Sequence, residues 1–373
     1  MKGTSMMKRT YLFMFLAALL LALAVPAFAE DVPTLRASVS FSTHQEAFTV
    51  AMAKGPEFKD LGVWLEPVVE REKFDLYENG KKVARLNLII SKGGSETSAL
   101  FAQNHLDLAL NSTPAMLAAI DRGTKIKILA PLQADGIAMA TRTDIDVKGW
   151  DAFQDYVKKS KKPVTVGYHS LTSAPKIIFE SAMSHNGLKT TGNANATKEE
   201  ADILMVDIKS MSNVIPSFTA KQIEFAVVNT PTSEVIEAKK QGHIVLQMKE
   251  LPPKGEWESF PCCCVAGSDA IVKAHPEAVA AYVKLITESS KWCMANKLEA
   301  AKVTSEWYGL DADIIAKADI EFSTKVTPTW LKNAALYPDM LNQLGQLTGA
   351  LKGKKLADVY DLVFDFQFTE VEK

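Results

Sequence analysis

The chain has 373 residues, of which 47% are hydrophobic, and its formal net charge at pH 7 is −2. This length allows a large core and more than one domain, and the weak charge, without a long basic stretch, argues against a nucleic-acid partner. After the N-terminal segment, no hydrophobic run approaches the length of a transmembrane helix. We therefore expect a soluble, compact protein.

The N-terminus has the pattern of an export signal. Lys2, Lys8 and Arg9 precede an apolar run over residues 11–25, and the Ala-Phe-Ala sequence that ends at Ala29 is a small-residue cleavage pattern. The run is shorter than the roughly 20 residues that span a bilayer, and no cysteine at the junction could carry a lipid. We predict cleavage after Ala29 and a mature protein that resides in the periplasm.

Strand and helix patterns alternate through the first third of the mature chain. The expected strands cover residues 35–40, 86–90, 106–110 and 125–130, and the expected helices cover 45–54, 96–103 and a segment that opens at Pro114. Residues 73–77 and 81–86 form an expected hairpin through Asn79-Gly80, a favoured turn pair. We interpret this hairpin as a surface decoration, with a lid over a pocket as the alternative.

A second alternating series begins after Trp150. Its expected strands cover residues 164–167, 203–208 and 225–228, and an expected helix covers 174–186. Residues 210–217 lead into a short helix, and residues 190–200 read as a loop. After Cys264 the pattern is mostly helical, with a long helix over 277–295. Repeated β-α-β units predict an α/β fold of two lobes, each a mainly parallel sheet flanked by helices, with a helical C-terminal region. We place lobe one at residues 31–139 plus 264–373 and lobe two at residues 140–263.

Loops of small polar residues follow the carboxyl ends of these strands, where open α/β sheets bind ligands. Each loop offers hydroxyls or amides beside a helix N-terminus, which favours an anion or a polar group. One such loop alone is better explained as a helix N-cap, whereas five at equivalent strand ends favour a shared cleft. The predicted ligand-binding residues are Ser42, Thr43, His44, Gly94, Ser95, Asn111 and Ser112 from lobe one, and His169, Ser170, Thr172 and Asn229 from lobe two.

Six ordered landmarks run through the mature chain: a strand followed by an Ala-rich helix at 47–54, GGSET at 93–97, HLDLALNSTP at 105–114, DRGTKIKI at 121–128, residues 164–173, and AGSDAIVKAHPEAV at 266–279. With them the chain resembles the solute-binding proteins of nitrate, sulfonate and taurine-type ABC importers and the thiamine-pyrimidine-precursor binders. The resemblance implies a two-lobed periplasmic-binding-protein fold of type II with a hinged cleft, an inner-membrane ABC permease as partner, and no catalysis.

The predicted function is therefore the capture of a small polar or anionic solute in the cleft between the lobes by hinge closure. We expect a monomer that needs neither a cofactor nor a metal ion. The predicted binding residues contain no arginine, which favours a monoanion or a neutral polar molecule over a dianion.

Three adjacent cysteines, Cys262, Cys263 and Cys264, are the most unusual feature of the composition, and Cys293 is the fourth cysteine. Consecutive residues on a strand point to opposite faces, so the three could converge on one ion only if the backbone were irregular. We interpret them as small residues of a buried strand between the lobes and leave a disulfide to Cys293 open. The alternative is a thiolate cluster for iron, copper or zinc.

Two other classes of function remain open. Fungal-type thiamine-pyrimidine synthases of the same superfamily carry a CCCFC-like motif and consume one of their own histidines. Residues 262–266 match only the first half of that motif, and an export signal argues against this cytosolic chemistry. The other alternative is a periplasmic sensory protein that delivers its ligand to a receptor. No G-x-S-x-G or H-E-x-x-H motif supports a hydrolytic enzyme.

Overall fold

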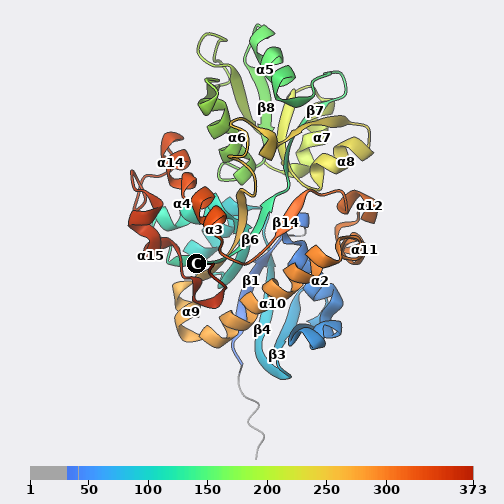
Figure 1. Ribbon diagram of the computed structural model, residues 1–373, viewed down its shortest axis with the longest axis vertical. Coiled ribbons are helices and arrows are strands. Elements are labelled where there is room, and N and C mark those ends of the chain that lie inside the picture. Colours follow the sequence, from blue (N-terminus) through green and yellow to red (C-terminus); the bar gives the residue numbers. More distant parts are fainter. Residues whose placement is uncertain (1–31, 41, 373) are drawn as a thin grey trace, which may run out of the picture. The chain divides into compact units, whose positions relative to one another are not determined.

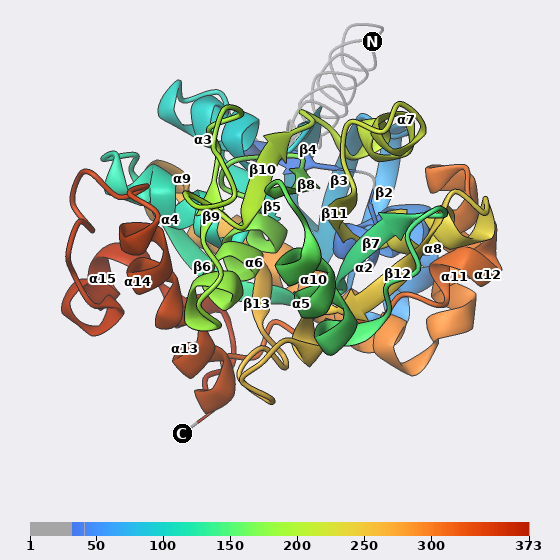
Figure 2. The ribbon, with the colours of Figure 1, turned by 90° about the horizontal axis from the view of Figure 1, so that it is seen from above.

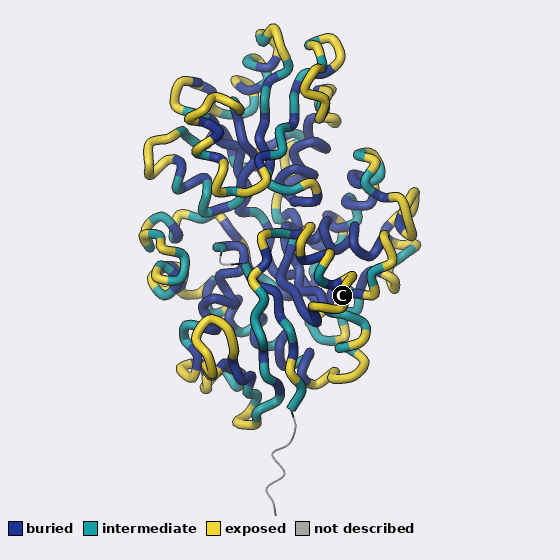
Figure 3. Tube along the Cα trace, turned by 180° about the vertical axis from the view of Figure 1, so that it is seen from behind, coloured by how far each residue is buried: buried dark blue, intermediate teal, exposed yellow. Residues whose placement is uncertain are grey.

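The computed structural model describes residues 32–40 and 42–372, and the predicted export signal lies outside them. The described chain forms two β-sheets, one of eight strands and one of six, each with helices packed on it (Figure 1). Buried residues follow the strands and the inner helices, whereas the exposed ones lie mainly on the outer loops (Figure 3). The α/β class predicted from the sequence is confirmed.

The eight-stranded sheet has the order β14-β6-β13-β5-β1-β4-β3-β2. Its strands are β1 (Thr34–Val39), β2 (Val63–Val69), β3 (Lys73–Glu78), β4 (Lys81–Ile90), β5 (Leu108–Ser112), β6 (Ile126–Asp135), β13 (Pro261–Ser268) and β14 (Ile320–Phe322). β1 is parallel to both β4 and β5, so these three strands end at the same edge of the sheet. The other five pairings of this sheet, including those of β13 with β5 and with β6, are antiparallel, so the sheet is mixed and not mainly parallel as predicted.

The expected hairpin is present, but it is not a surface decoration. β3 and β4 pair around the turn at Asn79-Gly80, and β4 continues without a break into residues 86–90, which we had expected as a separate strand. β2, a strand that the sequence did not predict, pairs with the other side of β3. The hairpin therefore extends the sheet edge, and its buried Phe74 and Leu76 belong to the core.

The six-stranded sheet has the order β12-β7-β11-β8-β10-β9. Its strands are β7 (Ile137–Arg142), β8 (Val164–Tyr168), β9 (Thr190–Thr191), β10 (Ile203–Asp207), β11 (Phe225–Asn229) and β12 (Gly242–Gln247). β8 is parallel to β10 and to β11, so these strands also end at one edge. β7 and β12, which the sequence did not predict, are antiparallel to their neighbours.

Helices cover both sheets, and the long helix α10 (Pro276–Ala295) packs on the eight-stranded sheet. The α-helices are α2 (Glu46–Lys54), α3 (Gly94–Ala102), α4 (Thr113–Asp121), α5 (Gly149–Lys159), α6 (Ala174–His185), α7 (Val214–Thr219), α8 (Thr232–Ala238), α9 (Asp269–Ala274), α10 (Pro276–Ala295), α11 (Lys297–Tyr308), α12 (Ala312–Ile315), α13 (Pro328–Ala334), α14 (Leu336–Gln343) and α15 (Tyr360–Val363). The 3₁₀ helices are η1 (Thr43–Gln45), η2 (Gly55–Leu61), η3 (Met211–Asn213), η4 (Met248–Glu250), η5 (Leu356–Val359) and η6 (Phe366–Phe368).

Helix α10 packs on α2 through an edge-on contact of Tyr282 with Phe48, whose ring centroids are 5.6 Å apart. Helices α13 to α15 gather on one side of the molecule, and α11 and α12 lie on the other (Figure 2). Within residues 32–372, no helix combines the length and the apolarity that crossing a bilayer requires.

The chain changes sheets at Gly136, between β6 and β7, and returns to the first sheet before Pro261. Gly136 has a φ of 66°, and a Cβ at this position would lie 3.2 Å from His44 Nε2, so both the backbone conformation and the space favour glycine. The lobe boundaries expected from the sequence, 139/140 and 263/264, lie inside β7 and β13.

Asp135, which precedes this crossover, gives a prediction for the pH dependence of stability. Burial raises its pKa from 3.8 to about 6, against the opposing charge of Lys249. Between these values the folded protein holds a proton that the unfolded chain has already released, so stability is lost as the pH rises through this window. Because the carboxyl is partly exposed, we expect the loss to be about 1–2 kcal/mol.

Asp135→Asn should therefore be more stable than the wild type above pH 6 and should match it near pH 4, in urea unfolding followed by circular dichroism. Asparagine tolerates the left-handed backbone of this position, where φ is 60°. Asp60→Asn, at an exposed position, is the matched control. If the free energies of unfolding of Asp135→Asn and the wild type differ by the same amount at pH 4 and above pH 6, the raised pKa of Asp135 is contradicted.

Candidate functional site

The predicted binding loops follow strands that end at the same edges of the two sheets. Ser42 and His44 follow β1, Gly94 follows β4, and Asn111 and Ser112 close β5. In the second sheet, His169 follows β8 and Asn229 is the last residue of β11. Since β1, β4 and β5 are parallel, as are β8 and β11, each set of loops converges at one sheet edge.

A pocket of about 300 Å³ lies where these two sets of loops face each other. Its lining comes from both sheets and comprises Ser40, Ser42, His44, Gln45, Lys92, Gly93, Gly94, Asn111, Ser112, Cys262, Cys263, Tyr308 and Leu310 on one side and His169, Ser173, Ala174, Pro175, Ser210, Met211, Asn229, Thr230, Pro231 and Thr232 on the other. The volume suits a small solute. A larger hollow of about 650 Å³, lined in part by Lys284, Lys325 and Phe368, lies away from these strand ends.

Seven of the eleven predicted residues line this pocket, and four do not. The seven are Ser42, His44, Gly94, Asn111, Ser112, His169 and Asn229. The other four, Thr43, Ser95, Ser170 and Thr172, are absent from the lining and instead join the two sets of loops to each other.

These joining contacts are hydroxyl pairs. Thr43 Oγ1 lies 2.8 Å from Thr230 Oγ1 in a buried contact. Ser95 Oγ lies 3.2 Å from Ser170 Oγ and 3.4 Å from Thr172 Oγ1. Neutral hydroxyl pairs of this kind contribute little net free energy each, because water hydrates both hydroxyls once the loops separate.

Two polar atoms of the pocket residues are buried without a hydrogen-bond partner among the described residues. They are His169 Nδ1 and Asn229 Oδ1. Burial lowers the pKa of His169 to about 4, with a smaller contribution from the charge of His44, so its imidazole is neutral at neutral pH. Buried polar atoms are nearly always paired. These two unpaired atoms are the ones that a bound solute could satisfy.

The electrostatics of the pocket favour negative charge. No aspartate or glutamate of the described chain lines it, whereas Lys92 does. The N-termini of α3 and α6 open on it at Gly94 and Ala174, and free backbone N–H groups at such ends attract anions. Arg142 does not contribute, because its guanidinium binds Asp144 and the Ile223 carbonyl.

Several pocket residues were not among those predicted, and local sequence patterns explain only some of them. Gln45 and Lys92 adjoin predicted loops and could have been found from them. Tyr308 lies at the end of α11, and its hydroxyl donates to the Ser42 carbonyl at 3.1 Å. Nothing in the local sequence of Tyr308 indicates that it meets a loop 266 residues earlier.

The strand that carries the three adjacent cysteines has an irregular backbone, which is what neighbouring side chains need in order to point to the same side. Against β6, the register of β13 shifts between Pro261 and Cys263 and again between Cys263 and Cys264, so that Cys262 is an extra residue. This bulge brings Cys262 Sγ to 3.7 Å from Cys263 Sγ. Cys264 lies apart from this pair, with its thiol 3.6 Å from the Asn111 carbonyl.

All four cysteines, including Cys293, are free and buried, so the disulfide that the sequence left open is not formed. Hydrogen bonding to Cys262 and burial raise the pKa of the Cys263 thiol. Within the described residues, His44, Cys262 and Cys263 form the one cluster whose side chains could hold a metal ion.

His243, Trp257 and Phe260 lie outside the pocket lining and make contacts within the folded chain. His243 Nε2 lies 2.9 Å from the Val147 carbonyl oxygen. Trp257 packs on Phe260, with ring centroids 5.4 Å apart, and donates its indole N–H to the Pro252 carbonyl. These aromatic rings belong to the core.

Comparison with known proteins agrees with this geometry. The NMT1-like family matches residues 41–309. The uncharacterized protein MJ1180 of Methanocaldococcus jannaschii is 31% identical over 134 residues, which cover 35% of this chain and 92% of that protein.

Three solved structures resemble the whole fold. The ligand-binding component of an ABC-type import system from Staphylococcus aureus, with zinc bound, is 12% identical, with a TM-score of 0.64 over 90% of this chain and 97% of that one. The alkanesulfonate-binding protein SsuA from Xanthomonas axonopodis pv. citri, bound to MOPS, is 9% identical, with a TM-score of 0.62 over 89% and 98%. The periplasmic nitrate-binding protein NrtA from Synechocystis PCC 6803 is 14% identical, with a TM-score of 0.63 over 91% and 87%.

At these identities the three structures establish the fold alone, and it is the periplasmic-binding-protein fold that the sequence predicted. The family match rests on sequence and covers most of the chain. This protein belongs to the NMT1-like family.

Proposed function

We propose that this protein is the exported solute-binding component of an ABC importer. It captures a small polar or anionic solute in the pocket between the two sheets and delivers it to an inner-membrane permease, without catalysing a reaction on it. The main support is the pocket of about 300 Å³, which the strand ends of both sheets line and which contains two unpartnered polar atoms. The named roles of the structural relatives in import and in binding agree with this proposal.

The proposed solute is a monoanion such as a sulfonate or nitrate, or an anionic pyrimidine precursor. Its charge would face Lys92 and the N-termini of α3 and α6, and its oxygens would accept a hydrogen bond from His169 Nδ1 in the tautomer that protonates this nitrogen. Asn229 Oδ1 would accept from a solute that also carries an N–H or O–H group, such as taurine or a pyrimidine precursor. A dianion is less suitable because the described lining contains one lysine and no arginine.

The predicted residues divide into two roles in this proposal. Ser42, His44, Gly94, Asn111, Ser112, His169 and Asn229 contact the solute. Thr43, Ser95, Ser170 and Thr172 form contacts that close the lobes around it, since these neutral pairs can separate at little cost when the solute leaves. The lobes are the units built on the two sheets, joined by the crossovers at Gly136 and before Pro261, and they move as a hinged monomer in the periplasm.

Asn229→Leu is expected to weaken solute binding by about 10-fold or more, because it keeps the branched shape of the side chain but removes the amide that would pair with the solute. Nitrate, aliphatic sulfonates, taurine, bicarbonate and pyrimidine precursors would be screened by thermal shift on the protein purified from the exported fraction. A ligand that binds the folded state raises its melting temperature by mass action. Calorimetric titration would then give the affinity of each hit.

Asn87→Leu is the matched control. The Oδ1 atom of Asn87 is also buried without a partner, but this residue lies on β4 and does not line the pocket. The control should bind the solute as tightly as the wild type. In cells, deletion of the gene should abolish uptake of the solute, and the wild-type protein but not Asn229→Leu should restore it. Equal affinity of Asn229→Leu and the wild type, or conversion of the solute to a product by the purified protein, would contradict the proposal.

A further inference from the structure

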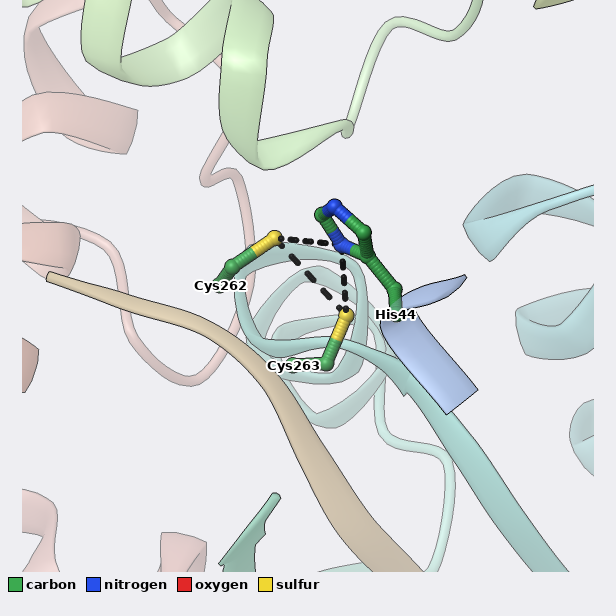
Figure 4. A group of neighbouring side chains, drawn as sticks. All are labelled: His44, Cys262 and Cys263. Carbon is green, nitrogen blue, oxygen red and sulfur yellow. Dashed lines mark hydrogen bonds between the residues drawn. The ribbon is translucent and has the colours of Figure 1, made fainter. Parts of the chain in front are cut away.

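The ring of His44 has a defined tautomer. Its Nε2 lies 2.9 Å from the carbonyl oxygen of Gly136, and a carbonyl can only accept a hydrogen bond. In the neutral ring, Nε2 therefore carries the proton, and Nδ1 presents a lone pair. Figure 4 shows this nitrogen facing the sulfur atoms of Cys262 and Cys263.

These three atoms form a triangle with nearly equal sides. His44 Nδ1 lies 3.4 Å from Cys262 Sγ and 3.8 Å from Cys263 Sγ, and the two sulfurs are 3.7 Å apart. Tetrahedral zinc, with bonds of about 2.3 Å to sulfur and about 2.0–2.1 Å to nitrogen, separates two sulfurs by about 3.8 Å and sulfur from nitrogen by about 3.6 Å. The three donors are thus spaced as three ligands of one tetrahedral ion.

The surroundings of the triangle also match those of a metal site. The side chains are held rigidly, since the exposed fractions of Cys262, His44 and Cys263 are 1%, 2% and 6%. Histidine ligands commonly donate their second ring N–H to a backbone carbonyl, which orients the ring and increases its basicity, and Gly136 supplies that carbonyl here. Asn229 makes a long contact with Nδ1, at 3.5 Å, and is the one other side chain recorded at this nitrogen in the described chain.

The triangle lies on the wall of the pocket, because all three residues belong to its lining. A metal ion bound to them would keep its fourth position on the pocket side. Three protein ligands and one open position are typical of zinc sites that bind an exogenous molecule, whereas purely structural sites are closed by four protein ligands. The unpartnered Nδ1 of His169 is part of the same lining.

We propose that His44 Nδ1, Cys262 Sγ and Cys263 Sγ form a binding site for one thiophilic metal ion, best matched by zinc(II), with its fourth coordination position open to the pocket. On binding, the two S–H bonds break, two metal–sulfur bonds form and two protons leave to solvent. The two thiolates then balance the charge of the divalent ion in this buried place. The site shares His44 and the pocket with the proposed solute-binding function, but metal binding can be measured in the absence of the solute.

The test is a titration of the metal-free, exported protein, kept reduced, with zinc(II) against a chromophoric chelator. Cobalt(II) would serve as the spectroscopic probe. The wild type should bind one ion per chain and give a thiolate-to-cobalt charge-transfer band. Cys262→Ser and Cys263→Ser should each weaken binding by at least about 100-fold and diminish that band, since even second-shell changes cost about 10- to 100-fold.

The matched control is the double variant Cys264→Ser/Cys293→Ser, which retains only the two proposed ligand cysteines. These two thiols lie outside the cluster, so the control should bind metal as the wild type does. A thiol count on the denatured protein confirms reduction, and Cys262→Ala and Cys263→Ala replace any serine variant that does not fold. Absence of stoichiometric binding by the reduced wild type, or an unchanged charge-transfer band in the Cys262→Ser/Cys263→Ser variant, would overturn the proposal. The solute screen is run on the exported protein both as purified and after metal removal, so failure of either proposal can be recognised separately.

Discussion

Replacing Asp121 with alanine is expected to lower the free energy of unfolding by about 3–5 kcal/mol. Asp121 is the last residue of α4 and is buried, with an exposed fraction of 2%. Its carboxylate accepts hydrogen bonds from the backbone N–H groups of Thr348, Gly349 and Leu351 at 2.8–2.9 Å. Alanine would leave these three donors without their acceptor. Water can reach Thr348 and Gly349, which are exposed, whereas the N–H of Leu351 is buried and would stay unpaired.

The aspartate also fixes the C-terminal segment through its main chain. The Asp121 carbonyl accepts from the Ala350 N–H at 2.9 Å, and a Cβ at Gly349 would lie only 2.0 Å from the same oxygen. The close approach therefore requires glycine. Through its side chain and its carbonyl, Asp121 thus positions a turn that is more than 220 residues away in the sequence.

Urea unfolding followed by circular dichroism would measure the effect. The matched control is Asp339→Ala, which removes an aspartate that also contacts the C-terminal segment, at Lys355, but whose side chain is half exposed. Exposed ion pairs contribute about 0–1 kcal/mol, so the control should lose no more than that. A loss of less than about 1 kcal/mol in Asp121→Ala would show that the segment from residue 348 is not anchored in this way.

The sequence predicts the central strands and the loops that follow them because both have strong local signals. Strands β1, β5, β8, β10 and β11 are short apolar runs, each followed by small polar residues, and the structure places them within a few residues of the prediction. Parallel pairing then brings loops such as those of Ser112 and Asn229 to the sheet edges. Local pattern and topology together place seven of the eleven predicted residues in the pocket lining.

The remaining features depend on contacts between distant residues. β7 and β12 contain many small or semi-polar residues and adopt strands because they pair with β11 and with each other. Alternation along a strand predicts that Cys262 and Cys263 face opposite sides, and only the bulge against β6 brings their sulfurs together. The meeting of Asp121 with Gly349 has no local signal at all.

Removing one partner of the buried ion pair Lys176–Glu180 is expected to destabilise the protein by about 3–5 kcal/mol. Both residues lie on α6, four positions apart, and their side chains are only 7% and 8% exposed. The Lys176 ammonium also lies 5.1 Å from the centre of the Tyr168 ring. In Lys176→Met, the Glu180 carboxylate would lose its counter-charge in a place that water hardly reaches.

Replacing both charged residues, so that no unpaired charge stays buried, should recover most of the lost free energy of unfolding. Two buried charges lose their hydration on folding, and their mutual attraction offsets that cost only in part. Apolar side chains of similar size need no such compensation. We therefore expect Lys176→Met/Glu180→Leu to be within about 1 kcal/mol of the wild type, or more stable than it, although each single variant is strongly destabilised.

The matched control is the pair Asp155–Lys159 on α5, which has the same spacing but side chains that are 64% and 79% exposed. Its double-mutant cycle should give a coupling energy of at most about 0.5 kcal/mol. A coupling energy of similar size for both pairs would mean that water solvates the α6 pair. Because α6 begins at the pocket with Ala174 and Pro175, such a result would also indicate that solvent from the pocket reaches the first turns of this helix.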